Sequence, residues 1–267
     1  MTVNILFIGD IVGKPGRKAV RELLPILKER HRIDLVVANG ENASGGIGIS
    51  PKEADELLSG GVHVLTSGNH IWKKKEIFAY IQENPDLLRP ANYPEGAPGR
   101  GFVVKEVPGG CRVGIINLLG RTFMEAVDCP FRKASEICEL LDDQTRVLLV
   151  DFHAEATSEK AALGFFLDGK VSAVLGTHTH IQTSDEKILP QGTAYLTDAG
   201  MTGPADSVIG VKKELAIERF LTQLPNKFEV AKKALVLEGA LISVDPKTGK
   251  AVGITRIRER LTGGAET

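Results

Sequence analysis

The feature that most constrains the fold is an alternation of short apolar runs with amphipathic stretches early in the chain. Apolar runs at 3–9, 33–39 and 62–68 have the composition of buried strands, whereas the stretches at 17–30 and 51–60 between them have the apolar spacing of helices. Strands connected through helices run parallel, and the helices cover the faces of the sheet. The alternation therefore predicts an α/β fold that begins with a parallel βαβαβ unit.

The rest of the chain continues this alternation with less regular spacing. Helices are expected at 73–82, 131–142 and 158–166, and strands at 101–106, 112–118, 146–153, 171–177, 193–198 and 234–245. The later strands follow one another closely, which favours antiparallel additions to the sheet. Because neither a repeat, a low-complexity tract nor a linker interrupts the sequence, we expect a mixed α/β sandwich that forms a single domain over residues 1–267.

Composition excludes several classes of function. Hydrophobic residues make up 42% and charged residues 25% of the chain, which predicts a packed core. The formal net charge of −1 argues against a dedicated duplex nucleic-acid binder. Three cysteines without metal-type spacing are typical of reduced thiols in a cytosolic protein. The start of the sequence has no signal-peptide pattern and no apolar run reaches membrane-span length, so we expect a cytoplasmic protein without a membrane partner.

Two histidines one residue apart, His178 and His180, follow an apolar run in the segment VLGTHTHIQT. If the segment continued as a strand, alternation would point both side chains the same way. Two imidazoles aimed at one point are uncommon in a core and common around a metal ion. The pair therefore favours a metal site.

Metal-capable side chains also follow four other predicted strands: Asp10 in FIGD, Glu41 and Asn42 in ANGEN, Asn69 and His70 in TSGNH, and His153 in VDFHAE. The carboxyl edge of an open α/β sheet is where ligands bind. Carboxylate, amide and imidazole groups without a thiolate suit Mn, Fe, Zn or Ni. A bridging carboxylate in such a set holds two ions roughly 3.5–4 Å apart, and these ions generate hydroxide near neutral pH. The pattern predicts a two-metal centre for phosphate chemistry.

Taken singly, these residues have simpler interpretations. Asp10 is equally suited to a turn or a helix cap, and GEN and GNH are common loop sequences. A lone histidine is more often a partly buried structural residue. The joint occurrence favours the metal site, because four of the six histidines fall in these turns. His31 and His63 do not, and we expect structural roles for both.

Other segments carry weaker signals. GDIVGKPGR lacks the spacing of a phosphate-binding P-loop, and we expect Gly13–Gly16 to form a turn into the first helix. Arg121 and Thr122 follow a predicted strand and are candidates for substrate phosphate contact, with scaffolding as the alternative. The segment 202–210, TGPADSVIG, has the composition of a mobile surface loop that covers the site.

Two acidic residues flank His153 in the sequence. Asp151 and Glu155 are both candidates for accepting a hydrogen bond from an imidazole N–H, which would fix the orientation of a metal-binding ring.

The ordered series GD, GEN, GNH, DFH and GTHTH resembles the calcineurin-like metallophosphoesterases. Their usual pattern is GDxH, GDxxD, GNH(D/E), a lone His and GHxH. Val12 stands where the first motif has its histidine, and Glu41 followed by Asn42 stands where the second has its bridging aspartate. These departures, together with GENA, GNHIW, RPANYPEG, DFHAEATSEK and TDAGMTGPADSVIG, are similar to the YmdB-like phosphodiesterases over nearly the whole chain.

The resemblance implies a four-layer sandwich in which two mixed β-sheets are flanked by α-helices. It also implies an enzyme that opens 2′,3′-cyclic nucleotides or another small phosphodiester and is linked to bacterial gene regulation. The implied cofactors are two transition-metal ions per chain, Fe first, with Mn or Zn as alternatives.

The motifs also imply a role for each residue. The first metal would be held by Asp10, Glu41, Asn42 and His180, with Glu41 bridging, and the second would be completed by Asn69, His153 and His178. Metal-bound hydroxide would attack phosphorus, and His70 would protonate the leaving oxygen as a general acid. The alternative role for His70 is to orient a ligand.

Two other classes of function remain open at this point. One is a metal-bearing regulator that binds a nucleotide or a partner without turnover. The other is a phosphomonoesterase or an RNA nuclease. The sequence names neither the metal nor the preferred nucleobase, and it leaves homo-oligomerisation open.

Overall fold

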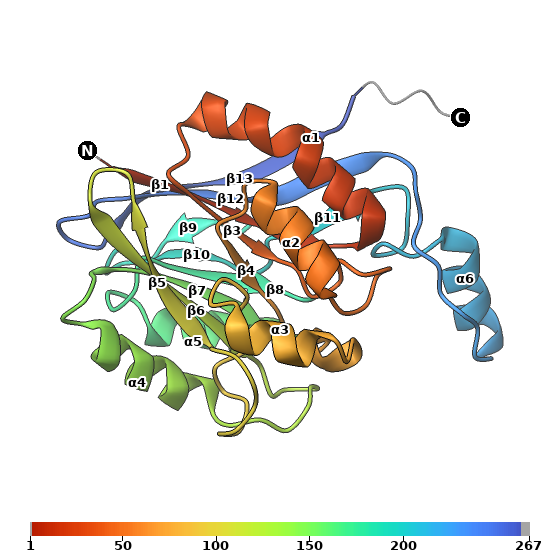
Figure 1. The fold of residues 1–267 in the computed structure, drawn as a ribbon, viewed down its shortest axis with the longest axis horizontal. Coiled ribbons are helices and arrows are strands. Elements are labelled where there is room, and N and C mark those ends of the chain that lie inside the picture. The colour runs from red at the N-terminus through yellow and green to blue at the C-terminus, as the bar shows by residue number, and fades with distance from the viewer. Residues whose placement is uncertain (1, 263–267) are drawn as a thin grey trace.

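The computed structural model describes residues 2–262, which form two mixed β-sheets and six α-helices (Figure 1). The first sheet has the order β2 (Asp10–Ile11), β11 (Met201–Pro204), β12 (Leu235–Val244), β1 (Val3–Ile8), β3 (Leu35–Asn39) and β4 (Val64–Thr66), and β13 (Ala251–Arg260) also pairs with β12. The second has the order β5 (Phe102–Val107), β6 (Cys111–Leu119), β7 (Val147–His153), β8 (Ala173–Thr177), β10 (Ala194–Leu196) and β9 (Lys187–Ile188).

Strand directions follow the expectation for the early strands but not for most of the later ones. β1, β3 and β4 run parallel, as the βαβαβ alternation predicts. β11 and β12 pair antiparallel, as do β12 and β1. In the second sheet β6, β7, β8 and β10 were expected to be antiparallel additions and run parallel, because helices connect β6 to β7 and β7 to β8. The outer strands β5 and β9 are antiparallel to their neighbours. The parallel strands are apolar along most of their length because both faces of each sheet are covered.

Apolar side chains fill three layers of core. The central layer lies between the sheets and contains residues such as Phe7 and Val37 from one sheet and Leu149 and Leu175 from the other. Two outer layers lie between each sheet and its helices. Burying one such side chain contributes about 1.5–3 kcal/mol, so the central layer ties the two sheets together.

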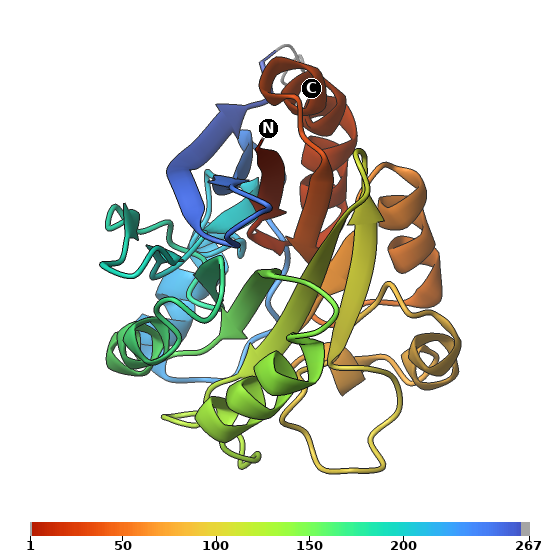
Figure 2. The same cartoon turned by 90° about the vertical axis from the view of Figure 1, so that its left-hand side faces the viewer.

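The helices lie on the outer faces of the sheets (Figures 1 and 2). The first sheet is covered by α1 (Gly13–His31), α2 (Pro51–Ser59) and α3 (Ile77–Glu83), and the second by α4 (Pro130–Leu141) and α5 (Thr157–Phe166). A 3-10 turn, Ile71–Lys73, precedes α3, and α6 (Lys213–Thr222) stands apart from both sheets. The expected four-layer arrangement of two mixed sheets between helices is confirmed.

Several sequence expectations are corrected. Gly13–Gly16 is the first turn of α1 itself rather than a separate turn before it. A Cβ at Gly16 would lie 2.4 Å from the Thr202 carbonyl oxygen, so only glycine lets the helix pack so closely. The expected helix at 73–82 is shorter and follows the separate 3-10 turn. The start of the segment 202–210 is not a mobile loop, because β11 is a buried strand between β2 and β12.

The strands β2, β9, β11 and β13 and the helix α6 were not predicted. β13 lies at a sheet edge and carries charged residues in its second half, and most of its residues lie outside the core. None of the helices between residues 2 and 262 is long and apolar enough to cross a membrane. In the same range Cys111, Cys129 and Cys138 are free thiols.

Candidate metal centre

The seven residues predicted to bind metal, and His70, predicted to be the general acid, lie at strand ends from both sheets. The first sheet supplies Asp10 in β2, Glu41 and Asn42 after β3, and Asn69 and His70 after β4. The second supplies His153 at the end of β7, and His178 and His180 after β8. The two sets meet, since Asn69 Oδ1 lies 3.2 Å from His153 Nε2 and Asn42 Nδ2 lies 3.2 Å from His180 Nε2. All eight side chains therefore belong to one cluster between the sheet edges.

One part of the cluster, here called the histidine half, consists of Glu41, Asn69, His153 and His178. The possible ligand atoms of Glu41, His153 and His178 all lie within 4.8 Å of one another. His153 Nε2 lies 3.0 Å from His178 Nδ1, 3.2 Å from Glu41 Oε1 and 3.2 Å from Asn69 Oδ1. Nitrogen and oxygen atoms that can each donate a lone pair thus surround a common point, which fits a metal ion.

The other part, here called the carboxylate half, consists of Asp10, Asn42 and His180 and shares Glu41. Asp10 Oδ2 accepts a hydrogen bond of 3.0 Å from the backbone N–H of His178. Asp10 Oδ1 is buried without a hydrogen-bond partner among the described residues, and it lies 3.7 Å from His180 Nε2. A buried carboxylate oxygen with no partner costs free energy, so a cation fits this position.

Asn42 presents its amide nitrogen, rather than its oxygen, to the carboxylate half. Its Nδ2 lies 3.1 Å from Glu41 Oε1, and its Oδ1 lies 2.8 Å from His70 Nδ1. A metal ion is bound by the amide oxygen. A 180° rotation of the terminal amide exchanges the two atoms and would turn Oδ1 toward the carboxylate half.

The backbone at His178 and His180 explains how the two rings enter the cluster. β8 ends at Thr177, so neither histidine lies on a strand, and the expected alternation of strand side chains is wrong as the reason for their alignment. Both residues have positive φ, 101° at His178 and 64° at His180. Non-glycine residues rarely adopt such angles, and the strain concentrates at functional sites.

A buried ion pair that the sequence analysis missed holds this turn. Lys160 Nζ lies 2.7 Å from Asp198 Oδ2, and both residues are buried. The same oxygen accepts hydrogen bonds from the backbone N–H and the hydroxyl of Thr179, which separates the two histidines. Lys160 lies in DFHAEATSEK and Asp198 in TDAGM, so the only signal in the sequence was a charged residue in each of two family segments.

Gly68 leaves the space that the cluster occupies. A Cβ at this position would lie 2.1 Å from His153 Cδ2 and 2.5 Å from Glu41 Oε2. Any larger residue would therefore displace two of the candidate ligands.

Burial and neighbouring charges shift the pKa values in the cluster. Burial acts to raise the pKa of Glu41, but the imidazoles of His153 and His70 outweigh it and hold that pKa well below its usual range. Burial acts to lower the pKa of His153, but the carboxylates around it, Glu41 first, raise it to about 9. Burial and the charge of His153 lower the pKa of His178 to about 3, and burial raises that of Asp10. The cluster thus favours one positive charge at its centre, which is the environment a metal cation requires.

The two flanking acidic residues have different contacts. Glu155 Oε2 lies 3.0 Å from His178 Nε2 and so fixes the ring whose other nitrogen faces the cluster. Asp151 reaches His153 through Thr177, whose hydroxyl donates to Asp151 Oδ1 at 2.7 Å and lies 2.9 Å from His153 Nδ1. Asn39 forms a second bridge, because its Nδ2 donates to Asp151 Oδ2 at 3.1 Å and lies 3.4 Å from His153 Nδ1. Such outer contacts orient metal ligands.

Comparison with known proteins identifies the family. The family model described as "YmdB-like protein" matches residues 6–257. A curated protein of Bacillus subtilis, named 2′,3′-cyclic-nucleotide 2′-phosphodiesterase, is 50% identical over 255 residues, which is 96% of each chain. The chain belongs to the YmdB-like family. The predicted branch is confirmed, and this relationship also confirms the prediction that the chain is an enzyme.

Solved structures of similar proteins have the same fold. A hypothetical protein of Thermus thermophilus is 42% identical with a TM-score of 0.90, over 97% of this chain and 99% of the other. A phosphatase of Mycoplasma pneumoniae is 36% identical with a TM-score of 0.91, over 97% of this chain and 94% of the other. The predicted metallophosphoesterase-like fold is thereby confirmed for this YmdB-like chain.

Arg121 and Thr122 lie on the surface after β6, outside the cluster of this YmdB-like protein. Their backbone N–H groups donate to the carboxylate of Glu159 at 3.0 and 3.1 Å. Both line a surface pocket together with Met124. Their proposed contact with substrate phosphate stays a prediction.

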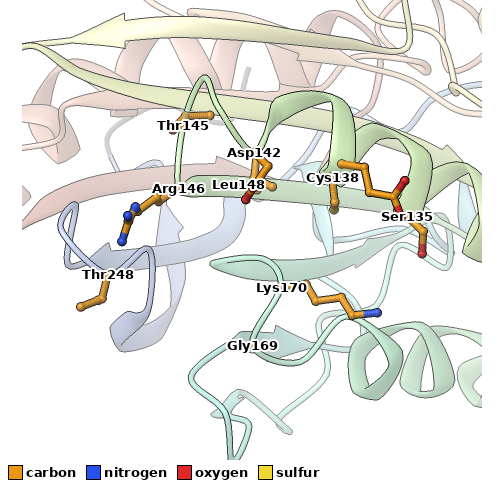
Figure 3. Close-up of a pocket in the computed structure, with 10 residues that line it drawn as sticks. Ser135, Cys138, Asp142, Thr145, Arg146, Leu148, Gly169, Lys170 and Thr248 are labelled. Atoms are coloured by element: carbon orange, nitrogen blue, oxygen red, sulfur yellow. The ribbon is translucent and has the colours of Figure 1, made fainter.

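A larger surface pocket lies at the opposite end of β7 (Figure 3). Leu148 in its lining is five residues before His153, which at about 3.3 Å per residue places the pocket roughly 16 Å from the cluster. Burial raises the pKa of the Cys138 thiol in this pocket to about 11. That thiol is therefore protonated at neutral pH and is a poor nucleophile. The distance along β7 shows that the pocket is separate from the cluster.

Proposed function

We propose that this protein is a metal-dependent phosphodiesterase that hydrolyses 2′,3′-cyclic nucleotides at the cluster. The observation that carries the proposal is the convergence of Glu41, His153 and His178 on one point between the two sheets. The name of the Bacillus subtilis relative, 50% identical over 96% of each chain, supports the choice of substrate.

The carboxylate half and the histidine half would each hold one metal ion, with Glu41 bridging the two. The proximity of Glu41 Oε1 to His153 Nε2 and the partnerless Asp10 Oδ1 support this division. Bound metals would stabilise charge on the phosphate oxygens and lower the pKa of water at the site. We propose iron as the native metal, as the family resemblance implies. Manganese and zinc are alternatives, because they share the ligand preferences of iron.

His70 is proposed as the general acid. Its Nδ1 lies 2.8 Å from Asn42 Oδ1 and 3.2 Å from Glu41 Oε1, and its backbone N–H donates to Glu41 Oε2. Its Nε2 has no hydrogen bond to any described residue, and the side chain is 27% exposed. The ring can thus be positioned through Nδ1 while Nε2 delivers a proton to the leaving oxygen.

The test of this function is the product formed from 2′,3′-cyclic AMP by protein of known metal content. Release of 3′-AMP, with 3′,5′-cyclic AMP left intact, supports the proposal. Two bound metals without product would favour a regulator that binds without turnover. Faster hydrolysis of a phosphomonoester or of single-stranded RNA would favour a phosphatase, which the names of Mycoplasma relatives include, or a nuclease.

The wider setting is also proposed rather than established. We propose that the chain acts as one domain, since both sheets contribute to the central core layer. Cytoplasmic location agrees with three unpaired cysteines in the described range. A role in bacterial gene regulation rests on the family resemblance alone.

A further inference from the structure

A strained and exposed aromatic residue, Phe123, lies in the connection between β6 and α4. Its side chain is 90% exposed, more than that of any other large apolar residue in the described part of the chain. Its φ is 62°, an angle that bulky residues rarely adopt. The backbone N–H of Met124 donates to the Arg121 carbonyl at 3.3 Å, so Phe123 is the third residue of a four-residue turn. Glycine is the usual residue where that position has positive φ.

Neither property of Phe123 stabilises the fold. A phenyl ring in water gives up the favourable burial that a core position would provide, and the positive φ adds backbone strain. A glycine at this position would avoid both costs. A single exposed apolar residue needs no explanation, but exposure combined with strain does. Because backbone strain concentrates at functional sites, a function that needs the ring explains Phe123 better than packing does.

The turn that carries Phe123 lies beside the histidine half. The backbone N–H of Gly120 donates to the carbonyl of His153 at 2.9 Å. Phe123 is three residues further along, which is at most about 10 Å of chain. β6 and β7 are neighbouring parallel strands, so the turn leaves the same carboxyl edge of the sheet at which the cluster lies and at which ligands bind.

Tyr93 links the turn to the centre of the cluster. Burial raises the pKa of Tyr93, and the negative charges of Glu125 and Glu41 raise it further. Such charge effects weaken quickly with distance, so Tyr93 lies near both carboxylates. Glu125 is two residues after Phe123, and Glu41 is the carboxylate shared by both halves. The turn and the cluster therefore border the same side chain.

Hydrogen bonds hold both ends of the connection in place. Asn92 is fully buried, and its Nδ2 donates to the carbonyls of Leu119 at 2.7 Å and Asp128 at 2.9 Å. The carboxylate of Glu159 accepts hydrogen bonds from the backbone N–H groups of the two residues before Phe123. The ring of Phe123 is thus presented on a fixed support.

We propose that Phe123 stacks on the base of the cyclic nucleotide substrate and so favours nucleotides over other small cyclic phosphodiesters, an inference that rests on the proposed phosphodiesterase function. Stacking of one base on an aromatic side chain strengthens binding about 5–150-fold. Every base has a flat face that can stack, so the ring would select nucleotides as a class rather than one particular base.

The test compares two substrates that share a five-membered cyclic diester. 2′,3′-Cyclic AMP carries a base, and glycerol 1,2-cyclic phosphate does not. In the metal-loaded full chain, Phe123→Gly should raise KM for 2′,3′-cyclic AMP about 5–150-fold. The kcat should hardly change, because stacking contributes equally to the ground state and the transition state. Both constants for glycerol 1,2-cyclic phosphate should stay as in the wild type. An unchanged KM for 2′,3′-cyclic AMP, or equal losses on the two substrates, would overturn the proposal.

Two further variants separate base contact from a structural role. Phe123→Tyr keeps the ring and should retain the wild-type KM. Phe165→Ala removes a phenyl group that is 61% exposed near the end of α5, and it should change neither substrate's constants. The Tm of Phe123→Gly should stay close to that of the wild type, because relief of backbone strain offsets the greater freedom of the unfolded chain. A lower Tm with losses on both substrates would indicate a packing role and contradict the proposal.

Binding measurements separate failure of this inference from failure of the catalytic function. Calorimetric titration with 3′-AMP and with inorganic phosphate compares a ligand that has a base with one that has none. The wild type should bind 3′-AMP more tightly, and Phe123→Gly should weaken the binding of 3′-AMP alone. If this pattern appears without hydrolysis of 2′,3′-cyclic AMP, the catalytic function fails and the base contact stands. Equal affinity of the wild type for the two ligands would overturn the base contact.

Discussion

The two halves of the metal cluster differ in how completely the fold assembles them. In the histidine half, His153 Nε2 already lies 3.0–3.2 Å from possible ligand atoms of His178, Glu41 and Asn69. In the carboxylate half, Asp10 Oδ1 lies 3.7 Å from His180 Nε2, and Asn42 presents an amide nitrogen.

The difference follows from what holds each half. His153 ends a fully buried strand, and Asn69 follows Gly68, at which the packing leaves no room for a Cβ. Asn42 and His180 both lie in turns after strands, and His180 contacts the Ile209 carbonyl on a surface segment. We infer that the histidine half is preformed, whereas the carboxylate half acquires its final geometry when a cation binds.

The largest expected effect comes from filling the space beside the histidine half. Gly68→Ala would place a methyl group 2.1 Å from His153 Cδ2, so His153 and Glu41 must both move. We expect metal content below one ion per chain and a loss of turnover of at least 100-fold, because ligand displacements of about 1 Å have effects of this size. Metal analysis and initial rates measure both.

Gly253→Ala is the matched control, since its added Cβ would meet its nearest atom at 3.9 Å. If Gly68→Ala retained two metals and wild-type turnover, the histidine half would not be a rigid, preformed site.

An effect on turnover without loss of metal is expected next to the carboxylate half. His70→Ala should retain both metals but lose about 10²–10⁴-fold in turnover of 2′,3′-cyclic AMP, because the proton donor is gone. A diester with a good leaving group, such as bis(4-nitrophenyl) phosphate, should be affected much less. Initial rates on both substrates, with His31→Ala as the control, test this.

Loss of metal from the His70→Ala protein would contradict the acid role. It would indicate instead that His70 acts by orienting Asn42 through the 2.8 Å contact between them.

The smallest effect should come from the outer contact of the histidine half. Glu155→Gln weakens the 3.0 Å interaction with His178 Nε2 but leaves the ring in place. Because the Glu155 side chain is 49% exposed, we expect about a tenfold loss of metal affinity, the low end for such contacts. Metal titration against Glu136→Gln as a control gives the comparison, and an unchanged affinity would mean that Glu155 does not support His178.

Sequence reasoning located the parallel core well because buried strands such as β1 and β3 are apolar except for one asparagine each. It failed at β13, whose charged residues obscure the pattern, and at α6, whose apolar residues do not face its own core.

The candidate residues themselves could be predicted because they follow strands in short motifs. The geometry of these residues could not be predicted from the sequence. The inward direction of His178 and His180 depends on positive φ angles. The support of that turn depends on Lys160 and Asp198, which are 38 residues apart.

Glu41→Gln tests the central claim, that one carboxylate serves both halves, most directly. The substitution keeps the shape of the side chain and removes its charge. Metal content and hydrolysis of 2′,3′-cyclic AMP should be measured on the same sample. If Glu41 serves both halves, the variant should bind at most one metal per chain and show no detectable turnover. Two metals per chain with wild-type turnover would contradict a shared carboxylate.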